Sequence, residues 1–121
     1  WGLAFKPKTD DMREAPAIPL VTALLSAGAR VQAYDPEALR VARGVFGNKV
    51  TYATKGYDAL KGADALAIVT EWNEFRTPDY KKMKSMLKTP VIFDGRNVYD
   101  LEKINSLSFT YYSIGREAVV K

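Results

Sequence analysis

The sequence predicts an α/β fold: a doubly wound, mainly parallel Rossmann-like sheet with helices on both faces, arranged as a three-layer sandwich. Short apolar runs alternate with helical patterns along the whole chain, which is typical of parallel strands joined by right-handed crossovers. Residues 63–69 (ADALAIV) are almost continuously apolar, as expected for a central parallel strand that is covered on both faces. With 121 residues, 47% of them hydrophobic, the chain is long enough to bury the core of a single domain.

Strands are expected at short runs that are rich in apolar and β-branched residues: 2–5, 30–34, 49–53, 63–69, 90–94 and 109–113. The first run follows Trp1 with no initiator Met. We therefore expect it to be the end of a truncated strand, and the chain to be a fragment of a longer protein. The last run, FTYYS, is expected at an edge of the sheet and is followed by a tail over 114–121.

Helices are expected between these strands, over 17–27, 36–46, 57–61, 79–88 and 100–106, with a loop or short helix over 70–75. In the first helix, Leu20 and Leu24 contribute to an apolar stripe, and Gly28 stands where a left-handed residue commonly ends a helix. Asp35 precedes Pro36, so we expect its carboxylate to cap the second helix.

The composition excludes several kinds of chemistry. The chain has no Cys, which excludes disulfides, thiolate nucleophiles and zinc–thiolate sites, and no His, the most common general base. We therefore assign no catalytic residue and no metal site to it. The net charge of +4 is spread along the sequence, which suits a small anionic ligand better than a nucleic acid. No apolar run approaches the ~18 residues that a membrane span needs, so no membrane association is expected.

Two charged loops are expected to form one anion-binding mouth. The first follows the strand at 2–5 and carries Lys6; the second follows the strand at 90–94 and carries Arg96. Because the carboxyl ends of parallel strands open at the same edge of a sheet, the ammonium of Lys6 and the guanidinium of Arg96 can converge there on a diphosphate. The alternative is that each is an ordinary solvated charge. Gly95 favours convergence, since a glycine lets a ligand approach the backbone closely.

Other charged residues near this edge have a structural interpretation. Asp10, Asp11 and Arg13 could form an acidic metal site beside a cation, but a loop held by its own hydrogen bonds, with a carboxylate capping the next helix, is more common. Arg13 lies beside the expected mouth and could reach a second ligand. Asp35 ends a strand where NAD-binding Rossmann domains place a ribose-binding carboxylate, but no GxGxxG precedes it. We therefore interpret Asp35 as a helix cap.

Four motifs, in this order, resemble the C-terminal domain of the UDP-glucose/GDP-mannose dehydrogenase family: GLAFKPKTDDMREAP over 2–16, AYDP over 33–36, TEWNEF over 70–75 and FDGRN over 93–97. The resemblance covers almost the whole chain. The first motif is fairly specific by itself, and within the family it is most similar to the bacterial UDP-glucose 6-dehydrogenases.

The resemblance implies an activity and the roles of four residues. Family members oxidise a nucleotide sugar at C6 in two NAD-dependent steps, as from UDP-glucose to UDP-glucuronate. An N-terminal Rossmann domain binds NAD and supplies the catalytic Cys, and a long central helix forms a homodimer or higher oligomer. The C-terminal domain binds the UDP portion: Phe5, Lys6 and Arg96 match positions that contact the nucleotide sugar, and Arg13 matches a position that reaches the NAD. Residues 1–121 are thus expected to be one C-terminal nucleotide-sugar-binding domain, inactive alone, of a cytoplasmic enzyme.

Two kinds of alternative stay open. A sibling enzyme acting on GDP-mannose or UDP-N-acetylmannosamine would carry the same domain, since the choice of base and sugar depends partly on the rest of the enzyme. A non-enzymatic flavodoxin-like module such as a signalling receiver has a related topology, but it needs an acidic cluster after the first strand and a Lys after the fifth. Here the first strand leads to Lys6 and the fifth leads to Arg96.

Overall fold

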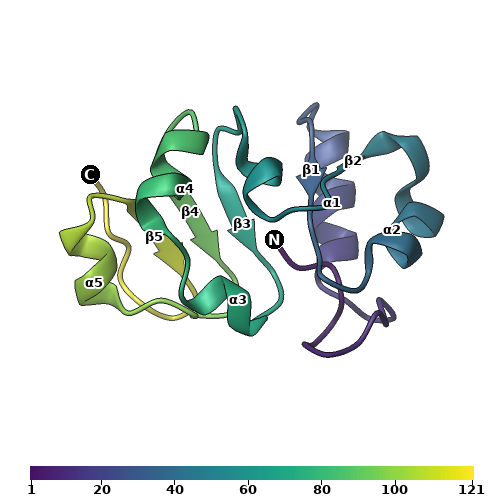
Figure 1. Ribbon diagram of the computed structural model, residues 1–121, viewed down its shortest axis with the longest axis horizontal. Helices are drawn as coiled ribbons and strands as arrows, with labels where there is room; N and C mark the ends of the chain where they lie inside the picture. Colours follow the sequence, from purple (N-terminus) through teal and green to yellow (C-terminus); the bar gives the residue numbers. More distant parts are fainter.

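A computed structural model describes the whole chain, Trp1–Lys121 (Figure 1). The helices are α1 (Ala17–Ser26), α2 (Leu39–Phe46), α3 (Asn73–Arg76), α4 (Tyr80–Met86) and α5 (Leu101–Ser106), with the 3-10 helices η1 (Gly47–Lys49) and η2 (Tyr57–Leu60). The strands are β1 (Gln32–Ala33), β2 (Thr51–Tyr52), β3 (Leu66–Ile68), β4 (Val91–Asp94) and β5 (Thr110–Ser113). Strand and helix alternate in the predicted order, but the strands are shorter than the sequence suggested.

All strand pairs are parallel, and the N-terminal residues join two small sheets into one layer. One sheet pairs β1 with β2, and the other has the order β3-β4-β5. Between them, the Trp1 amino group donates to Ala67 O at 2.8 Å and the Val69 N–H donates to Trp1 O at 2.9 Å. On the other side, the Gly2 N–H donates to Tyr34 O at 2.8 Å. The resulting order, β2-β1-N-terminus-β3-β4-β5, is that of doubly wound nucleotide-binding sheets.

The prediction of a strand over 2–5 is wrong in extent, although the segment lies where that strand belongs. Gly2 has φ +97°, which leaves the extended region. Beyond it, the N–H groups of Leu3 and Ala4 donate to the carboxylate of Asp35 rather than to a neighbouring strand. The ladder therefore ends after one residue pair on each side.

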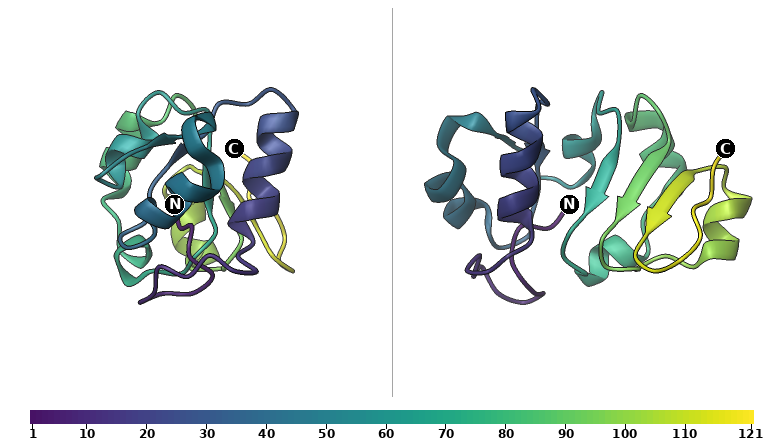
Figure 2. Two further views of the ribbon diagram at one scale, coloured as in Figure 1. Left: turned by 90° about the vertical axis from the view of Figure 1, so that its right-hand side faces the viewer. Right: turned by 180° about the vertical axis from the view of Figure 1, so that it is seen from behind.

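Helices lie on both faces of the strand layer, as predicted. One apolar core lies against β3, β4 and β5 and includes the fully buried Ile68, Ile92 and Tyr111. A second core lies around α1, α2 and β1 and includes Val21 and Ala42. Helices α1 and α4 lie on opposite faces of the strand layer, which makes three layers (Figures 1 and 2).

One part of the sheet has no helix in front of it when seen from behind (Figure 2, right). Phe93 of β4 and Tyr112 of β5 are exposed there, by 48% and 39%. Their rings stack with centroids 5.1 Å apart. The C-terminal tail protects β5 in another way, because Val119 pairs antiparallel with Tyr111. The expected edge strand is therefore partly covered.

Local sequence signals set several helix ends. Asp79 and Asp100 each accept a hydrogen bond from the backbone N–H three residues later and so cap α4 and α5. Gly28 has φ +89° just beyond α1, as predicted. The expected carboxylate cap on α1 is wrong: Pro16 is its N-cap and makes no side-chain hydrogen bond. Asp11 is occupied within its own loop instead.

Candidate functional site

The side chain of Arg96 joins the two predicted loops. Its Nη2 donates to Phe5 O at 3.1 Å, and its Nε donates to Val69 O at 2.9 Å. The loop over 5–16 therefore lies at the side of the molecule where β3 and β4 end (lower edge in Figure 1). This is the switch point of the sheet, between the N-terminal segment and β3, where ligands of doubly wound sheets bind.

Arg96 keeps unused hydrogen-bond donors. A guanidinium has five N–H donors, of which two are used by these carbonyls, so three remain. The side chain is half-buried, and a phosphate bound against it would be partly shielded from water, which strengthens the electrostatic attraction. Arg96 can therefore bind an anion while it holds the two loops together.

The backbone of the Arg96 loop is anchored by the carboxylate of Asp94, which is only 2% exposed. Its Oδ1 accepts from the Arg96 N–H at 2.9 Å, and its Oδ2 accepts from the Val98 N–H at 2.8 Å and from the Tyr111 hydroxyl at 2.6 Å. Burial, together with the hydrogen bond to Asp94, raises the pKa of Tyr111, so its hydroxyl keeps its proton and acts as a donor.

The sequence suggested that Gly95 lets a ligand approach the backbone closely, but in the structure its close neighbour is strand β3. The Gly95 N–H donates to Ile68 O at 2.8 Å, and a Cβ on Gly95 would lie 3.1 Å from that oxygen. The close backbone approach that glycine allows here is therefore to β3, and it fixes the start of the loop on the neighbouring strand.

Lys6 is exposed next to this junction. Its Nζ lies 5.4 Å from the centroid of the Phe5 ring, a cation–π contact. No acidic side chain pairs with it, since the single ion pair of the chain joins Asp11 and Arg13. Its ammonium is therefore available to a ligand at the same edge as Arg96.

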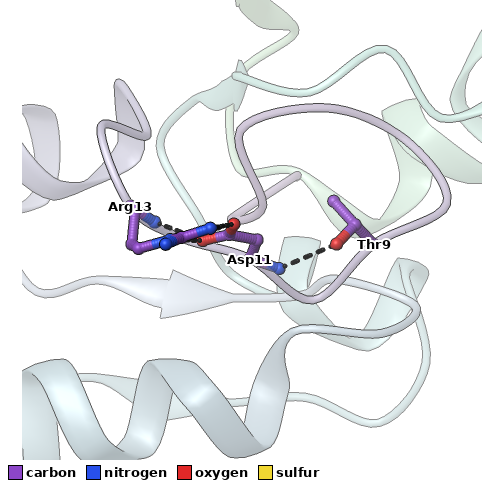
Figure 3. A network of polar contacts seen from close by, with 3 residues as sticks. All are labelled: Thr9, Asp11 and Arg13. Atoms are coloured by element: carbon purple, nitrogen blue, oxygen red, sulfur yellow. Dashed lines mark hydrogen bonds and ion pairs between the residues drawn. The ribbon is translucent and has the colours of Figure 1, made fainter.

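The loop over 5–16 is held by its own polar contacts (Figure 3). The Nη2 and Nε of Arg13 donate to the Asp11 carboxylate at 2.7 and 3.0 Å, and the Asp11 N–H donates to Thr9 Oγ1 at 3.2 Å. The hydrogen bonds from Arg13 lower the pKa of Asp11 to about 2. The interpretation of Asp11 as a structural residue is confirmed. The Arg13 side chain is 88% exposed, so it can also meet a ligand from outside.

Asp35 is a buried junction between three segments. Its carboxylate, 1% exposed, accepts five hydrogen bonds, all of 2.8 to 3.1 Å, from Glu37 N, Ala38 N, Leu3 N, Ala4 N and Trp72 Nε1. Asp35 caps the turn before α2 rather than the helix itself: its Oδ1 accepts from Glu37 N and Ala38 N, whereas the N-cap of α2 is Ala38, which makes no side-chain hydrogen bond. With five donors already bound, the carboxylate has no free position for a ribose hydroxyl.

Backbone strain is concentrated in the two loops. Lys8, Glu14 and Asn97 have φ between 53° and 65°, and they are three of the four non-glycine residues with positive φ. Such conformations cost energy in non-glycine residues and cluster at functional sites. Their position agrees with a site at this edge.

A shallow depression of about 530 Å³ lies against the loop over 5–16. It is lined by Thr9, Asp10, Asp11, Met12, Arg13, Ile18, Val41 and Val45. It combines charged loop residues with apolar side chains of α1 and α2.

No group of three or more Asp or Glu side chains gathers in a way that could hold a metal ion. None of the helices has the length and hydrophobicity that crossing a bilayer requires.

Sequence reasoning missed three groups that organise the site: the Asp94 carboxylate, the Trp72 indole and the amide of Asn97, which bonds to Ile114. The hydrogen bond from Trp72 to Asp35 spans 37 positions of the chain. The available signal was that all three lie at the end of a predicted strand or within three residues of it.

The fold and the site together define a doubly wound α/β domain of the nucleotide-binding class, with two cationic side chains at its switch point. Comparisons with known proteins agree. Over residues 1–101 the chain matches the UDP-glucose/GDP-mannose dehydrogenase family, UDP binding domain. The chain belongs to this family and corresponds to that domain.

Named relatives give the same result. A UDP-glucose 6-dehydrogenase from Rhizobium meliloti is 50% identical over 115 residues, which cover 95% of this chain and 26% of that protein. One from Pseudomonas aeruginosa is 47% identical over 121 residues, which cover 96% and 27%. The solved NDP-N-acetyl-D-galactosaminuronic acid dehydrogenase from Methanosarcina mazei Go1 has a TM-score of 0.80 at 30% identity, over 96% of this chain and 24% of that one. The chain spans about a quarter of the length of these relatives.

Proposed function

We propose that the chain is the nucleotide-sugar-binding domain of an NAD-dependent UDP-glucose 6-dehydrogenase, and that Phe5, Lys6 and Arg96 bind the substrate. The observation that carries the proposal is the position of Arg96. Its guanidinium lies at the switch point of the sheet between Phe5 O and Val69 O, with three N–H groups left for an anion.

The diphosphate of a UDP-sugar fits this arrangement chemically. A planar guanidinium binds two phosphate oxygens at once, and the exposed ammonium of Lys6 adds a second positive charge. The neighbouring Phe5 is half-buried beside both cations and can pack against the sugar or the base. In this proposal the domain binds and orients the substrate, and the reacting nucleophile comes from another domain of a longer protein.

Arg13 is proposed to contact the NAD cofactor. Its exposed guanidinium is held only by Asp11, and an exposed ion pair of this kind is weak because water screens it. A phosphate of a dinucleotide can therefore share or replace Asp11 at little cost. Two NAD⁺ molecules would be reduced per UDP-glucose oxidised to the acid, since each oxidation step removes one hydride.

The full-length protein is further proposed to be a homodimer or higher oligomer that works in the cytoplasm, where NAD and nucleotide sugars are available. A related dehydrogenase of another nucleotide sugar is the alternative. The M. mazei dehydrogenase, which is named for an N-acetylated sugar acid, has the same fold at 30% identity. Base and sugar specificity therefore need a direct test.

The test is an NMR titration of the 121-residue chain with UDP, GDP and NAD⁺ in parallel, at low salt to preserve the electrostatic attraction. We expect saturable shifts from UDP at Phe5, Lys6 and Arg96, and their loss in Arg96→Ala. Arg30→Ala, which removes an exposed arginine without a hydrogen-bond partner, is the matched control. Stronger shifts with GDP would favour the mannose sibling. Shifts confined to other surfaces would contradict the proposed site.

A further inference from the structure

The C-terminal tail reaches the Arg96 loop through a relay of hydrogen bonds. Arg116 Nη2 donates to the Tyr111 hydroxyl oxygen at 2.7 Å, and that hydroxyl donates to Asp94 Oδ2 at 2.6 Å. Asp94 Oδ1 in turn accepts from the Arg96 N–H at 2.9 Å. The matched family segment ends at residue 101, so both Tyr111 and Arg116 lie outside it.

The direction of the relay follows from its chemistry. A phenol has a single proton to donate, and Tyr111, which is completely buried, gives that proton to Asp94. Its oxygen can then only accept, and the guanidinium of Arg116 supplies the donor. Hydrogen bonds linked in this order strengthen one another in a low dielectric. Arg116 thereby strengthens the hydrogen bond from Tyr111 to Asp94.

Arg116 is itself fixed in place. Its Nη1 donates to Tyr99 O and its Nε donates to Ser113 Oγ, both at 3.0 Å. The side chain is half-buried, and its guanidinium lies 5.6 Å from the centroid of the Tyr111 ring. It is held at three points, by Tyr99 and by Tyr111 and Ser113 of β5, and so acts as a fixed support for Asp94.

The tail holds the same loop at a second point. Asn97 Nδ2 donates to Ile114 O and the Ile114 N–H donates to Asn97 Oδ1, both at 2.9 Å. Asn97 has φ +53°, a conformation that needs support from its surroundings. The backbone on both sides of Arg96 is therefore fixed, on one side through Asp94 and on the other through Asn97.

We propose that Arg116 is a positioning residue for substrate binding: acting through Tyr111 and Asp94, it holds the backbone of Arg96 so that the Arg96 guanidinium meets the diphosphate. This inference rests on the proposed function. It assigns a role to the C-terminal tail, which reaches the Arg96 loop directly at Asn97 and through Tyr111 at Asp94.

The first test compares UDP affinities by isothermal titration at a temperature where every variant is folded, so that a loss of stability alone does not change Kd. We expect Arg116→Ala and Tyr111→Phe each to weaken UDP binding by about tenfold, the equivalent of one hydrogen bond in the relay. The double variant should lose no more than either single one, because both break the same relay. Ser113→Ala is the matched control: it removes one partner of Arg116 but leaves the relay intact, and should bind like the parent.

The second measurement needs no ligand. Amide hydrogen exchange of the Arg96 and Val98 N–H groups, both of which donate to Asp94, should accelerate in Arg116→Ala and Tyr111→Phe but not in Ser113→Ala. Unchanged exchange would overturn the positioning role. If Arg96→Ala abolishes UDP binding and Arg116→Ala leaves it intact, the positioning role fails and the proposed function stands. If the parent chain does not bind UDP while exchange responds as expected, the proposed function fails and the relay stands.

Discussion

Arg96 donates a hydrogen bond from Nη2 to the carbonyl oxygen of Phe5, a residue 91 positions earlier in the chain. With the bond from Nε to Val69 O, this contact fixes the N-terminal loop against the ends of β3 and β4. Arg96 therefore has two tasks in the proposed site, since it shapes the loop that carries Lys6 and it offers donors to the ligand.

This double role predicts that lysine cannot replace Arg96. Arg96→Lys keeps the charge but loses the fork of donors that reaches two carbonyls and a phosphate together. We expect UDP affinity to fall by at least about tenfold and the free energy of unfolding to fall by about 1–3 kcal/mol. Calorimetric titration and urea denaturation measure the two effects. Binding as tight as in the parent chain would show that charge alone is sufficient.

We predict that the Asp35 carboxylate contributes more to the free energy of unfolding than an ordinary helix cap does. Asp35→Ala leaves five buried or half-buried donors without their acceptor, and we expect a loss of at least about 3 kcal/mol. Asp79→Ala and Asp100→Ala, which remove single exposed caps, should each cost about 1 kcal/mol. Urea denaturation of the three variants gives the comparison. Equal losses would mean that Asp35 acts only as a cap.

The sequence predicted the parts of the fold that local chemistry determines. The order of strands and helices and the left-handed Gly28 follow from patterns a few residues long. The meeting of the Lys6 and Arg96 loops also follows, because parallel strands end at one edge. Family membership was readable from four motifs.

Contacts between distant segments could not be predicted in this way. Nothing local indicates that the Trp72 indole turns to Asp35, or that Arg116 reaches Asp94 through Tyr111, since these partners depend on how the elements pack. Contacts between distant segments also explain why the N-terminal segment does not form the predicted strand. At Leu3 and Ala4 the backbone N–H groups donate to a buried carboxylate 32 and 31 residues away and leave the ladder.

Gly2 is predicted to tolerate no side chain. A Cβ there would lie 2.5 Å from the backbone nitrogen of Thr70, in addition to the cost of φ +97°. Gly28 has a similar φ, +89°, but open space around it. We expect Gly28→Ala to cost about 1 kcal/mol and Gly2→Ala about 3 kcal/mol or more, because backbone must move. Thermal unfolding followed by circular dichroism ranks the two, and a Gly2→Ala cost no larger than that of Gly28→Ala would show that the N-terminal segment shifts freely.

The Asp11 carboxyl is predicted to titrate with a pKa of about 2, because Arg13 donates hydrogen bonds to its charged form. The folded state therefore favours the carboxylate, so this contribution to stability is present above the ordinary pKa of 3.8 and is lost as the pH falls through about 2. NMR titration of the side-chain carbonyl carbon measures the pKa. In Arg13→Ala it should rise toward 3.8. A value that does not respond to this substitution would exclude Arg13 as the cause.

The amino group of Trp1 predicts a pH dependence of stability in a chain that starts at this residue. Burial lowers its pKa from 8.0 to about 5, although the charge of Asp35 acts in the opposite direction. Between these values the unfolded chain binds a proton that the folded chain does not, so stability rises with pH across this window. This difference in pKa corresponds to roughly 4 kcal/mol of folding stability, which is present in full above pH 8 and lost below pH 5.

The absence of His makes this amine the main group expected to titrate in that window, so the effect can be isolated. Urea denaturation of the free chain at intervals from pH 5 to pH 8.5 should show the rise. Acetylation of Trp1 removes the charge but keeps an N–H for Ala67 O, so the acetylated chain should show a nearly flat profile over the same range. Parallel profiles for the two forms would mean that the amino group becomes solvated in the folded state, and that the contact between Trp1 and β3 opens when the amine is protonated.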